Sequence, residues 1–448
     1  MRFVFGCLLV VFLITPGGVL AQTSSFGSLD DPREQAETAW WRRENRLDVM
    51  GGLSLIGPQW RGATAIRASL VGPRLALQLN GTLRGGIYGD YRNDRDELYD
   101  ALRLLEFVRY TPVRKRPGYN QYLRVGAIRN ARLGTGHLVD FFSTMTAWDA
   151  RTIGVEGFYQ TPSFNLAVFS DDVLMDGLVG GRLGLHPFRS QRGTRLRTLE
   201  LGLSLVTDQR IDQETFTGYN VDLSVDAFRT DPLAFTPFMS AAWYENQGHS
   251  FGLGAHVGTM PGGDFGSFQF TLAAFFNSNH FKPGYIGTFY GISNERARVL
   301  NAERFDPDRG TEQYADLPLS RLGSDLSIWT ELRVLIYEQV EVLYAFRREY
   351  ASTNLSTMHV RLFFETPGGT RLDLGLDRGD LGGFLTSFND LGDLTALVLN
   401  AEAQVRYPFW IFVQSRYTFE QRDDATDGTQ RFLVQRRFEP MAGLRLTF

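Results

Sequence analysis

The sequence has 448 residues, of which 43% are hydrophobic, and carries a formal net charge of −4 at pH 7. A charge this close to balance gives no reason to expect a nucleic-acid partner. The single cysteine, Cys7, excludes a disulfide within the chain.

Residues 1–21 have the pattern of a signal peptide. Arg2 supplies a positive start, Val4 to Ile14 form an apolar run, and Val19-Leu20-Ala21 offers small residues for cleavage after Ala21. The run is too short to cross a membrane as a helix, and no later stretch approaches the roughly 18 apolar residues that a spanning helix needs. We therefore expect an exported chain.

Residues 22–46 form a short lead-in to the first predicted strand. Asp30-Asp31-Pro32 has the acidic cap and first-turn proline with which helices begin. We interpret this stretch as a periplasmic N-terminal segment with some helix; insertion of the segment into a barrel lumen is the alternative.

Period-2 alternation recurs over residues 47–448. In Tyr219–Ala227, for example, apolar residues occupy one face and Asn220, Asp222, Ser224 and Asp226 the other. Such strands suit lipid on one side and water on the other. Marking every alternating segment predicts an all-β fold, a transmembrane antiparallel up-and-down β-barrel of about twenty strands, within a range of roughly 18 to 22.

The connections between these strands alternate in length. Every even-numbered connection is short and several contain proline or glycine, such as Gly72-Pro73, Thr161-Pro162 and Tyr407-Pro408, whereas the long connections, including 131–150 and 277–325, are odd-numbered. Barrels with both ends in the periplasm have short periplasmic turns and longer outer loops. We therefore place both ends of the barrel in the periplasm, and expect 131–150 and 277–325 to fold inward and narrow the lumen.

Aromatic residues near strand ends predict interfacial girdles. Tyr407, Phe409 and Trp410 would lie on the periplasmic side, and Trp243 and Tyr244 on the outer side.

The last strand ends in an amphipathic pattern. Leu444, Leu446 and Phe448 share one face, and Gly443, Arg445 and Thr447 the other. A terminal phenylalanine on such a strand resembles the insertion signal of bacterial outer-membrane β-barrel proteins. The resemblance implies a cell outer-membrane location, with the lipid bilayer and the barrel-assembly machinery as partners. Because proline removes a ladder donor, we expect Pro440 to sit at a bulge or before the paired stretch begins, in which case only Met441 to Phe448 pairs securely.

Alternation also selects the charged side chains that face the lumen, where they would act on a solute or pair across the wall. The predicted lumen-facing residues are Arg67, Asp222, Asp226, Glu331, Arg333, Arg347, Arg361, Arg371, Asp373, Asp377, Glu402, Arg406, Arg416 and Arg445.

The sequence does not favour an enzyme. Its six histidines, at positions 137, 186, 249, 256, 280 and 359, fit no metal-binding spacing, and no nucleophile elbow is present. We therefore predict no catalytic residues, no metal and no cofactor.

Two functions remain. The first is a porin-like channel for passive diffusion of small polar or anionic solutes, because barrels of this size leave an aqueous passage unless something fills it. The second is a non-transport barrel, an adhesin, assembly or structural protein, whose lumen is plugged.

Overall fold

The computed structural model describes residues 45–72, 74–86, 99–112, 119–147, 149, 151–175, 177–190, 195–209, 216–230, 233–245, 248–259, 267–278, 281–293, 297–300, 313–314, 325–336, 339–350, 356–366, 368–381, 394–422 and 430–448. The predicted signal peptide and residues 22–44 of the predicted N-terminal segment lie outside the described residues.

The described chain is almost entirely β-structure. The strands of the wall are β1 (Arg46–Ile56), β2 (Gln59–Val71), β3 (Leu75–Gly85), β4 (Leu105–Tyr110), β5 (Asn120–Gly126), β6 (Gly154–Gln160), β7 (Phe164–Ser170), β8 (Leu178–Leu185), β9 (Glu200–Asp208), β10 (Phe216–Ser224), β12 (Leu233–Tyr244), β13 (His249–Thr259), β14 (Ser267–Asn277), β17 (Leu326–Ile336), β18 (Val340–Glu349), β19 (Ser356–Glu365), β20 (Arg371–Leu381), β21 (Thr395–Arg406), β22 (Phe409–Arg422) and β23 (Gln430–Thr447).

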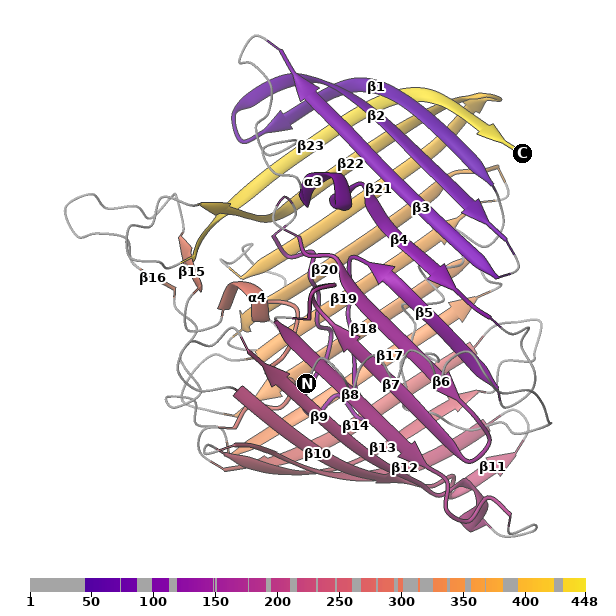
Figure 1. Cartoon of the computed structure of the whole chain (residues 1–448), viewed down its shortest axis with the longest axis vertical. Helices are drawn as coiled ribbons and strands as arrows, with labels where there is room; N and C mark the ends of the chain where they lie inside the picture. Colours follow the sequence, from indigo (N-terminus) through magenta and orange to yellow (C-terminus); the bar gives the residue numbers. More distant parts are fainter. Residues whose placement is uncertain are drawn as a thin grey trace.

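These strands close into a barrel. Each pairs antiparallel with the next along the chain, and β1 completes the ring by pairing with β23, so that Arg46 lies opposite Thr447. Within the described residues this gives a closed antiparallel barrel of 20 strands (Figure 1), which confirms the predicted fold class and strand number.

Shorter elements lie beside the wall. β11 (Phe228–Thr230) continues the line of β10 against β12, and β15 (Ala297–Leu300) pairs with β16 (Gln313–Tyr314) and with the start of β23. The helices are α3 (Tyr99–Arg103), η2 (Arg195–Thr198) and α4 (Tyr290–Ser293). None of the described helices combines the length and apolarity needed to cross a bilayer.

The wall has an apolar outside and a largely polar inside. On β10, Asn220, Asp222 and Ser224 are buried, whereas outward residues such as Ile66 on β2 and Phe276 on β14 are 53% and 52% exposed. Apolar side chains on the outer surface of a closed barrel are those that contact lipid. The alternation read from the sequence therefore corresponds to two physical faces of the wall.

Pro440 does not shorten the last strand. β23 begins at Gln430 and pairs with β22 through Pro440, which lies opposite Val413. The irregularity falls on the other side, where pairing with β1 is interrupted between Met441 and Phe438. The expectation that only residues 441–448 pair was wrong because proline lacks a donor toward one neighbouring strand only.

Candidate functional site

After β5 the chain turns into the barrel. Residues 127–147, which we name the inner loop, return on themselves where Ala131 and Phe142 exchange both backbone hydrogen bonds, at 2.6 and 3.0 Å. Gly134 and Gly136 turn the chain between them with φ angles of +54° and +73°, a region that glycine adopts without steric cost. The inner loop is therefore a compact element with its own backbone bonds.

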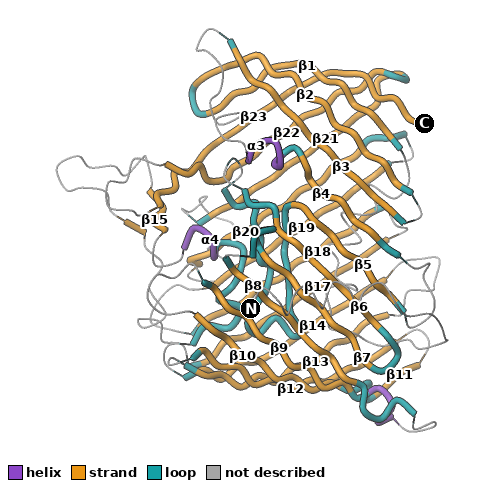
Figure 2. Tube along the Cα trace, viewed as in Figure 1, coloured by secondary structure: helices purple, strands orange, loops and turns teal. Residues whose placement is uncertain are grey.

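A second stretch, residues 281–293, lies against the inner loop; we name it the inner segment. The amide of Asp140 donates to the carbonyl of Ile286 at 3.1 Å, and the Thr288 hydroxyl donates to the carbonyl of Phe141 at 2.7 Å. Figure 2 shows these loop traces inside the ring of strands. The expectation that connections 131–150 and 277–325 fold inward is thus confirmed for their described residues in these two elements.

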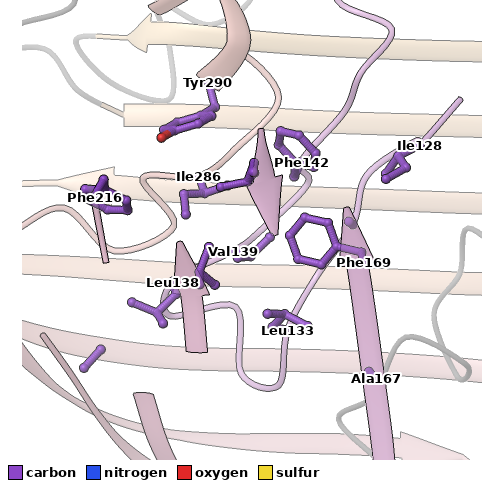
Figure 3. Packing of buried hydrophobic residues seen from close by; sticks show 14 of the residues in the cluster. Ile128, Leu133, Leu138, Val139, Phe142, Ala167, Phe169, Phe216, Ile286 and Tyr290 are labelled. Carbon is purple, nitrogen blue, oxygen red and sulfur yellow. The ribbon is translucent and has the colours of Figure 1, made fainter. Parts of the chain in front are cut away.

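On one side the inner loop is packed into an apolar core. Leu138, Val139 and Phe142 of the loop and Ile286 of the inner segment are buried among inward-facing side chains of β5–β10 and β12 (Figure 3). The wall residues of this core are Tyr122, Phe158, Ala167, Phe169, Leu178, Val206, Phe216, Ala242 and Tyr244. Interiors packed in this way hold few voids as large as a water molecule. This side of the lumen is filled.

Within that packed side, His137 is held by two strands. Its Nδ1 lies 2.8 Å from the hydroxyl of Ser240 on β12, and its Nε2 lies 2.8 Å from the hydroxyl of Ser250 on β13. The ring is fully buried and packs against Phe275 and Phe281. Both ring nitrogens are thus satisfied without water, as a buried imidazole requires.

Gly134 lies directly over a buried ion network. Arg182 of β8 donates to Asp222 of β10 at 2.6 Å and to Glu200 of β9 at 2.8 Å. A Cβ atom on Gly134 would stand 2.7 Å from Nε of Arg182. The inner loop approaches the wall this closely because the turn residue has no side chain.

Across the lumen, charged side chains anchor the same loop. Asp140 accepts hydrogen bonds from Arg347 of β18 at 2.8 Å and from Arg132 at 2.7 Å, and Arg132 also pairs with Glu331 of β17. Phe141 stacks on the His359 ring with centroids 3.9 Å apart. The inner loop therefore crosses the barrel and is fixed to both walls.

A polar cavity of about 200 Å³ remains between the inner loop and the strands β1–β4 and β18–β22. Its polar and charged lining comprises Arg46, Arg67, Gln78, Asn80, Glu106, Arg129, Asn130, Ser143, Thr146, Thr288, Glu341, Arg361, Asp373, Asp377, Asn400, Glu402, Gln414, Arg416 and Thr418. These residues come from strands that are distant in sequence and that only the closed ring brings together.

The charges of this cavity engage one another. Arg361 lies 2.8 Å from Asp377, and Arg129 lies 3.1 Å from Glu106. Glu402 accepts from Arg445 at 2.8 Å. The cavity wall thus carries many charged groups, and several of them neutralise each other locally.

The predicted lumen residues divide by their contacts. Arg67, Arg361, Asp373, Asp377, Glu402 and Arg416 line the cavity. The others bond within the wall or to the inner loop: Asp222 to Arg182, Asp226 to Thr236, Glu331 to Arg132, Arg333 to Glu341, Arg347 to Asp140, Arg371 to Glu365, and Arg445 to Asp48.

Arg406 is the exception, and its predicted lumen position is wrong. The register of β21 against β22 shifts between Gln404 and Arg406, which puts Arg406 opposite Phe409, an outward residue at 58% exposure. An extra residue in one strand inverts the alternation beyond it. Arg406 is accordingly exposed at the end of the strand.

Two aromatic side chains also depart from their predicted girdle positions. Tyr244 and Trp410 are buried in clusters inside the barrel, whereas their chain neighbours Trp243 and Phe409 face outward. The members of the predicted insertion signal, Leu444, Leu446 and Phe448, are exposed.

Several residues central to the lumen were not predicted from the sequence. Arg182 stands in a glycine-rich strand that has no clear polar alternation, and Gln78 and Asn80 are uncharged. The polar face of β3 was the available signal for Gln78 and Asn80, since both alternate with Leu77 and Leu79.

No protein-family model matches the sequence, and no curated protein matches it. Among solved structures, Wzi of Escherichia coli, described as an outer membrane protein involved in group 1 capsule assembly and a carbohydrate-binding β-barrel, is 12% identical; the alignment covers 92% of this chain and 86% of Wzi, with a TM-score of 0.34. Pseudomonas aeruginosa OccK9 (OpdG) is 8% identical over 90% of this chain and 98% of its own, with a TM-score of 0.32. P. aeruginosa OpdL is 10% identical over 90% of this chain and 99% of its own, with a TM-score of 0.29.

The class of the protein follows from its own geometry. A closed antiparallel ring with an apolar outer surface and a polar interior defines an outer-membrane β-barrel.

Proposed function

We propose that this barrel is a narrow porin-like channel through which small polar solutes diffuse across the outer membrane. The observation that carries the proposal is the position of the inner loop. It packs against the apolar side of the lumen and leaves the polar cavity on the other side, lined by β1–β4 and β18–β22. Infolded loops that constrict a polar lumen restrict passage by size while keeping a wet path.

The proposal includes the route to the membrane. Residues 1–21 would direct export and be removed, and Leu444, Leu446 and Phe448 would be read by the barrel-assembly machinery. The barrel would then contact lipid along its apolar outer surface.

Single-channel recording in planar bilayers tests the channel. We expect small, discrete conductance steps from the folded protein. The matched variant replaces residues 132–141 by two glycines, because Ala131 and Phe142 already pair directly and a two-residue hairpin turn can join them. This variant should conduct several times more current, with circular dichroism showing the same β-content.

A non-transport barrel is the second candidate. It is favoured by the apolar cluster of Ala147, Phe289, Ile292, Ala396, Phe419 and Phe432, which joins the inner loop and α4 to β21, β22 and β23. Under that function the inner loop is a permanent plug. Folded protein would then give no conductance, while the loop-shortened variant would.

A further inference from the structure

We infer that the cavity takes a small, neutral, hydroxyl-bearing solute, of the size of a polyol or monosaccharide, in preference to an ion. The inference deepens the proposed channel function and rests on it. It follows from three features of the cavity: unpartnered acceptors on β3, balanced charge, and an amide pair on β21 and β22.

The acceptors are side-chain oxygens of Gln78 and Asn80. Both residues line the cavity, and Gln78 is only 3% exposed. Neither Oε1 of Gln78 nor Oδ1 of Asn80 has a hydrogen-bond partner among the described residues, and both oxygens are shielded from solvent, so a ligand hydroxyl reaches them once the side chain turns toward the cavity. The two residues are two apart on one strand, so their side chains emerge on the same face roughly 6.6 Å apart. A buried acceptor without a partner costs free energy, which a ligand hydroxyl recovers by donating to it.

The charged residues that line the cavity do not favour the binding of an ion. They comprise five arginines, Arg46, Arg67, Arg129, Arg361 and Arg416, and five carboxylates, Glu106, Glu341, Asp373, Asp377 and Glu402. Because opposite charges balance and several are in direct ion pairs, the cavity offers no net charge to compensate an ion for its lost hydration. A neutral solute loses much less hydration on entry.

Strands β21 and β22, which also line the cavity, carry amides that suit the same ligand. Gln414 of β22 donates from Nε2 to Oδ1 of Asn400 at 2.6 Å, and Asn400 donates from Nδ2 to Asp373 at 3.3 Å. Amide groups present both donors and acceptors, which match hydroxyls in either role. The cavity has a volume of about 200 Å³, which has room for a small solute.

The test compares three solutes of similar size: glucose, gluconate and protonated glucosamine. Swelling of liposomes that contain the folded protein should be fastest with glucose. Gln78→Leu removes a free acceptor and should lower the glucose rate by about fivefold, the effect of one neutral hydrogen bond. The control is Gln269→Leu, the same change at a lumen-facing position of β14 outside the cavity lining, which should leave all three rates unchanged.

Equilibrium dialysis of labelled glucose separates this inference from the channel proposal. Gluconate or glucosamine entering as fast as glucose would overturn the inference while leaving a channel in place. A third outcome is that glucose binds and that Gln78→Leu weakens this binding, but that glucose does not permeate. That outcome would support the ligand class and overturn the channel proposal. Absence of both permeation and binding would overturn both.

Discussion

Arg347 of β18 joins two elements of the lumen through one guanidinium: its Nη2 donates to Oδ2 of Asp140 at 2.8 Å, and its Nη1 donates to the carbonyl of Pro283 at 2.6 Å. Asp140 belongs to the inner loop and Pro283 to the inner segment. Both charged side chains are buried, so water does not compete for these bonds. Through this one side chain the wall is bonded to both the inner loop and the inner segment.

Replacing Arg347 by methionine should weaken the attachment of the inner loop and the inner segment to the wall. Asp140 keeps Arg132 as a partner, but the bonds of Arg347 to Asp140 and to the carbonyl of Pro283 are both lost, so we expect a loss of about 3 kcal/mol in the free energy of unfolding, as for two hydrogen bonds made by a charged group. Urea unfolding in detergent micelles measures the loss, and bilayer recording should show larger and noisier conductance steps. Arg348→Met is the control, because Arg348 is the next residue on β18 and lies over Tyr350 at the end of the strand. Equal effects of the two substitutions would contradict the anchoring role of Arg347.

Gly134 should tolerate no side chain. Gly134→Ala combines a left-handed backbone with a Cβ atom 2.7 Å from Arg182 and 2.9 Å from Asp222. Gly57→Ala isolates the backbone effect, because its φ of +57° is nearly the same and nothing lies within 4 Å of the new Cβ. We expect about 1 kcal/mol of destabilisation at Gly57, the usual cost of a left-handed alanine, and clearly more at Gly134. Urea midpoints of the two variants give the comparison.

The wall was predictable from the sequence because a strand that separates lipid from water must alternate. That constraint acts on each residue locally and is visible in β10 and β20 without any knowledge of the partner strands. The alternation of short and long connections then predicted the direction in which each strand crosses the membrane. The number of strands and the inward folding of the inner loop followed from these two patterns.

The filling of the lumen could not be predicted in the same way. Inward residues such as Phe158 and Phe169 are apolar because the inner loop covers them, and apolar residues on both faces of a strand erase the alternation. The ion partners Arg132 and Glu331 are 199 positions apart, a pairing that only the closed ring creates. Arg406 was misplaced because one extra residue, Val405, inverts the pattern without a signal in composition.

The stability of the inner loop should depend on pH through His137, which lies outside the spanning strands. Burial, reinforced by the positive charge of Arg347, lowers the pKa of His137 from 6.5 to about 3. The unfolded chain therefore binds a proton below about 6.5 that the folded chain excludes, and folded stability falls as the pH falls from there toward 3, by up to roughly 1.4 kcal/mol per pH unit.

His137→Gln isolates this effect. The amide of glutamine can bond a serine hydroxyl but does not titrate. The difference in unfolding free energy between wild type and His137→Gln, measured by urea unfolding across this range, should shrink as the medium is acidified. A constant difference would show that His137 does not carry the pH dependence.

Phe448 should contribute more to insertion of the barrel into the outer membrane than to the stability of the folded barrel. Its side chain is 72% exposed, so its removal costs the folded barrel little. Phe448→Ala should therefore refold normally in detergent and yet reach the outer membrane in reduced amounts in cells. Val405→Ala is the control, since Val405 is an apolar residue at 66% exposure that lies outside the terminal strand. Normal membrane levels of Phe448→Ala would rule out Phe448 as the insertion signal.

The pairing of Arg361 with Asp377 should set the charge selectivity of the cavity. The two side chains are 2.8 Å apart and both line the cavity, so either one alone would leave an uncompensated charge on its wall. Asp377→Asn should move the reversal potential under a salt gradient toward anion selectivity, and Arg361→Gln should move it toward cation selectivity, because a fixed charge in a narrow passage attracts its counter-ion. The unmodified protein should lie between them, close to no selectivity, and Arg348→Gln should not differ from it. No shift in either variant would mean that ions do not pass this pair, and the conducting path would then have to lie elsewhere in the barrel.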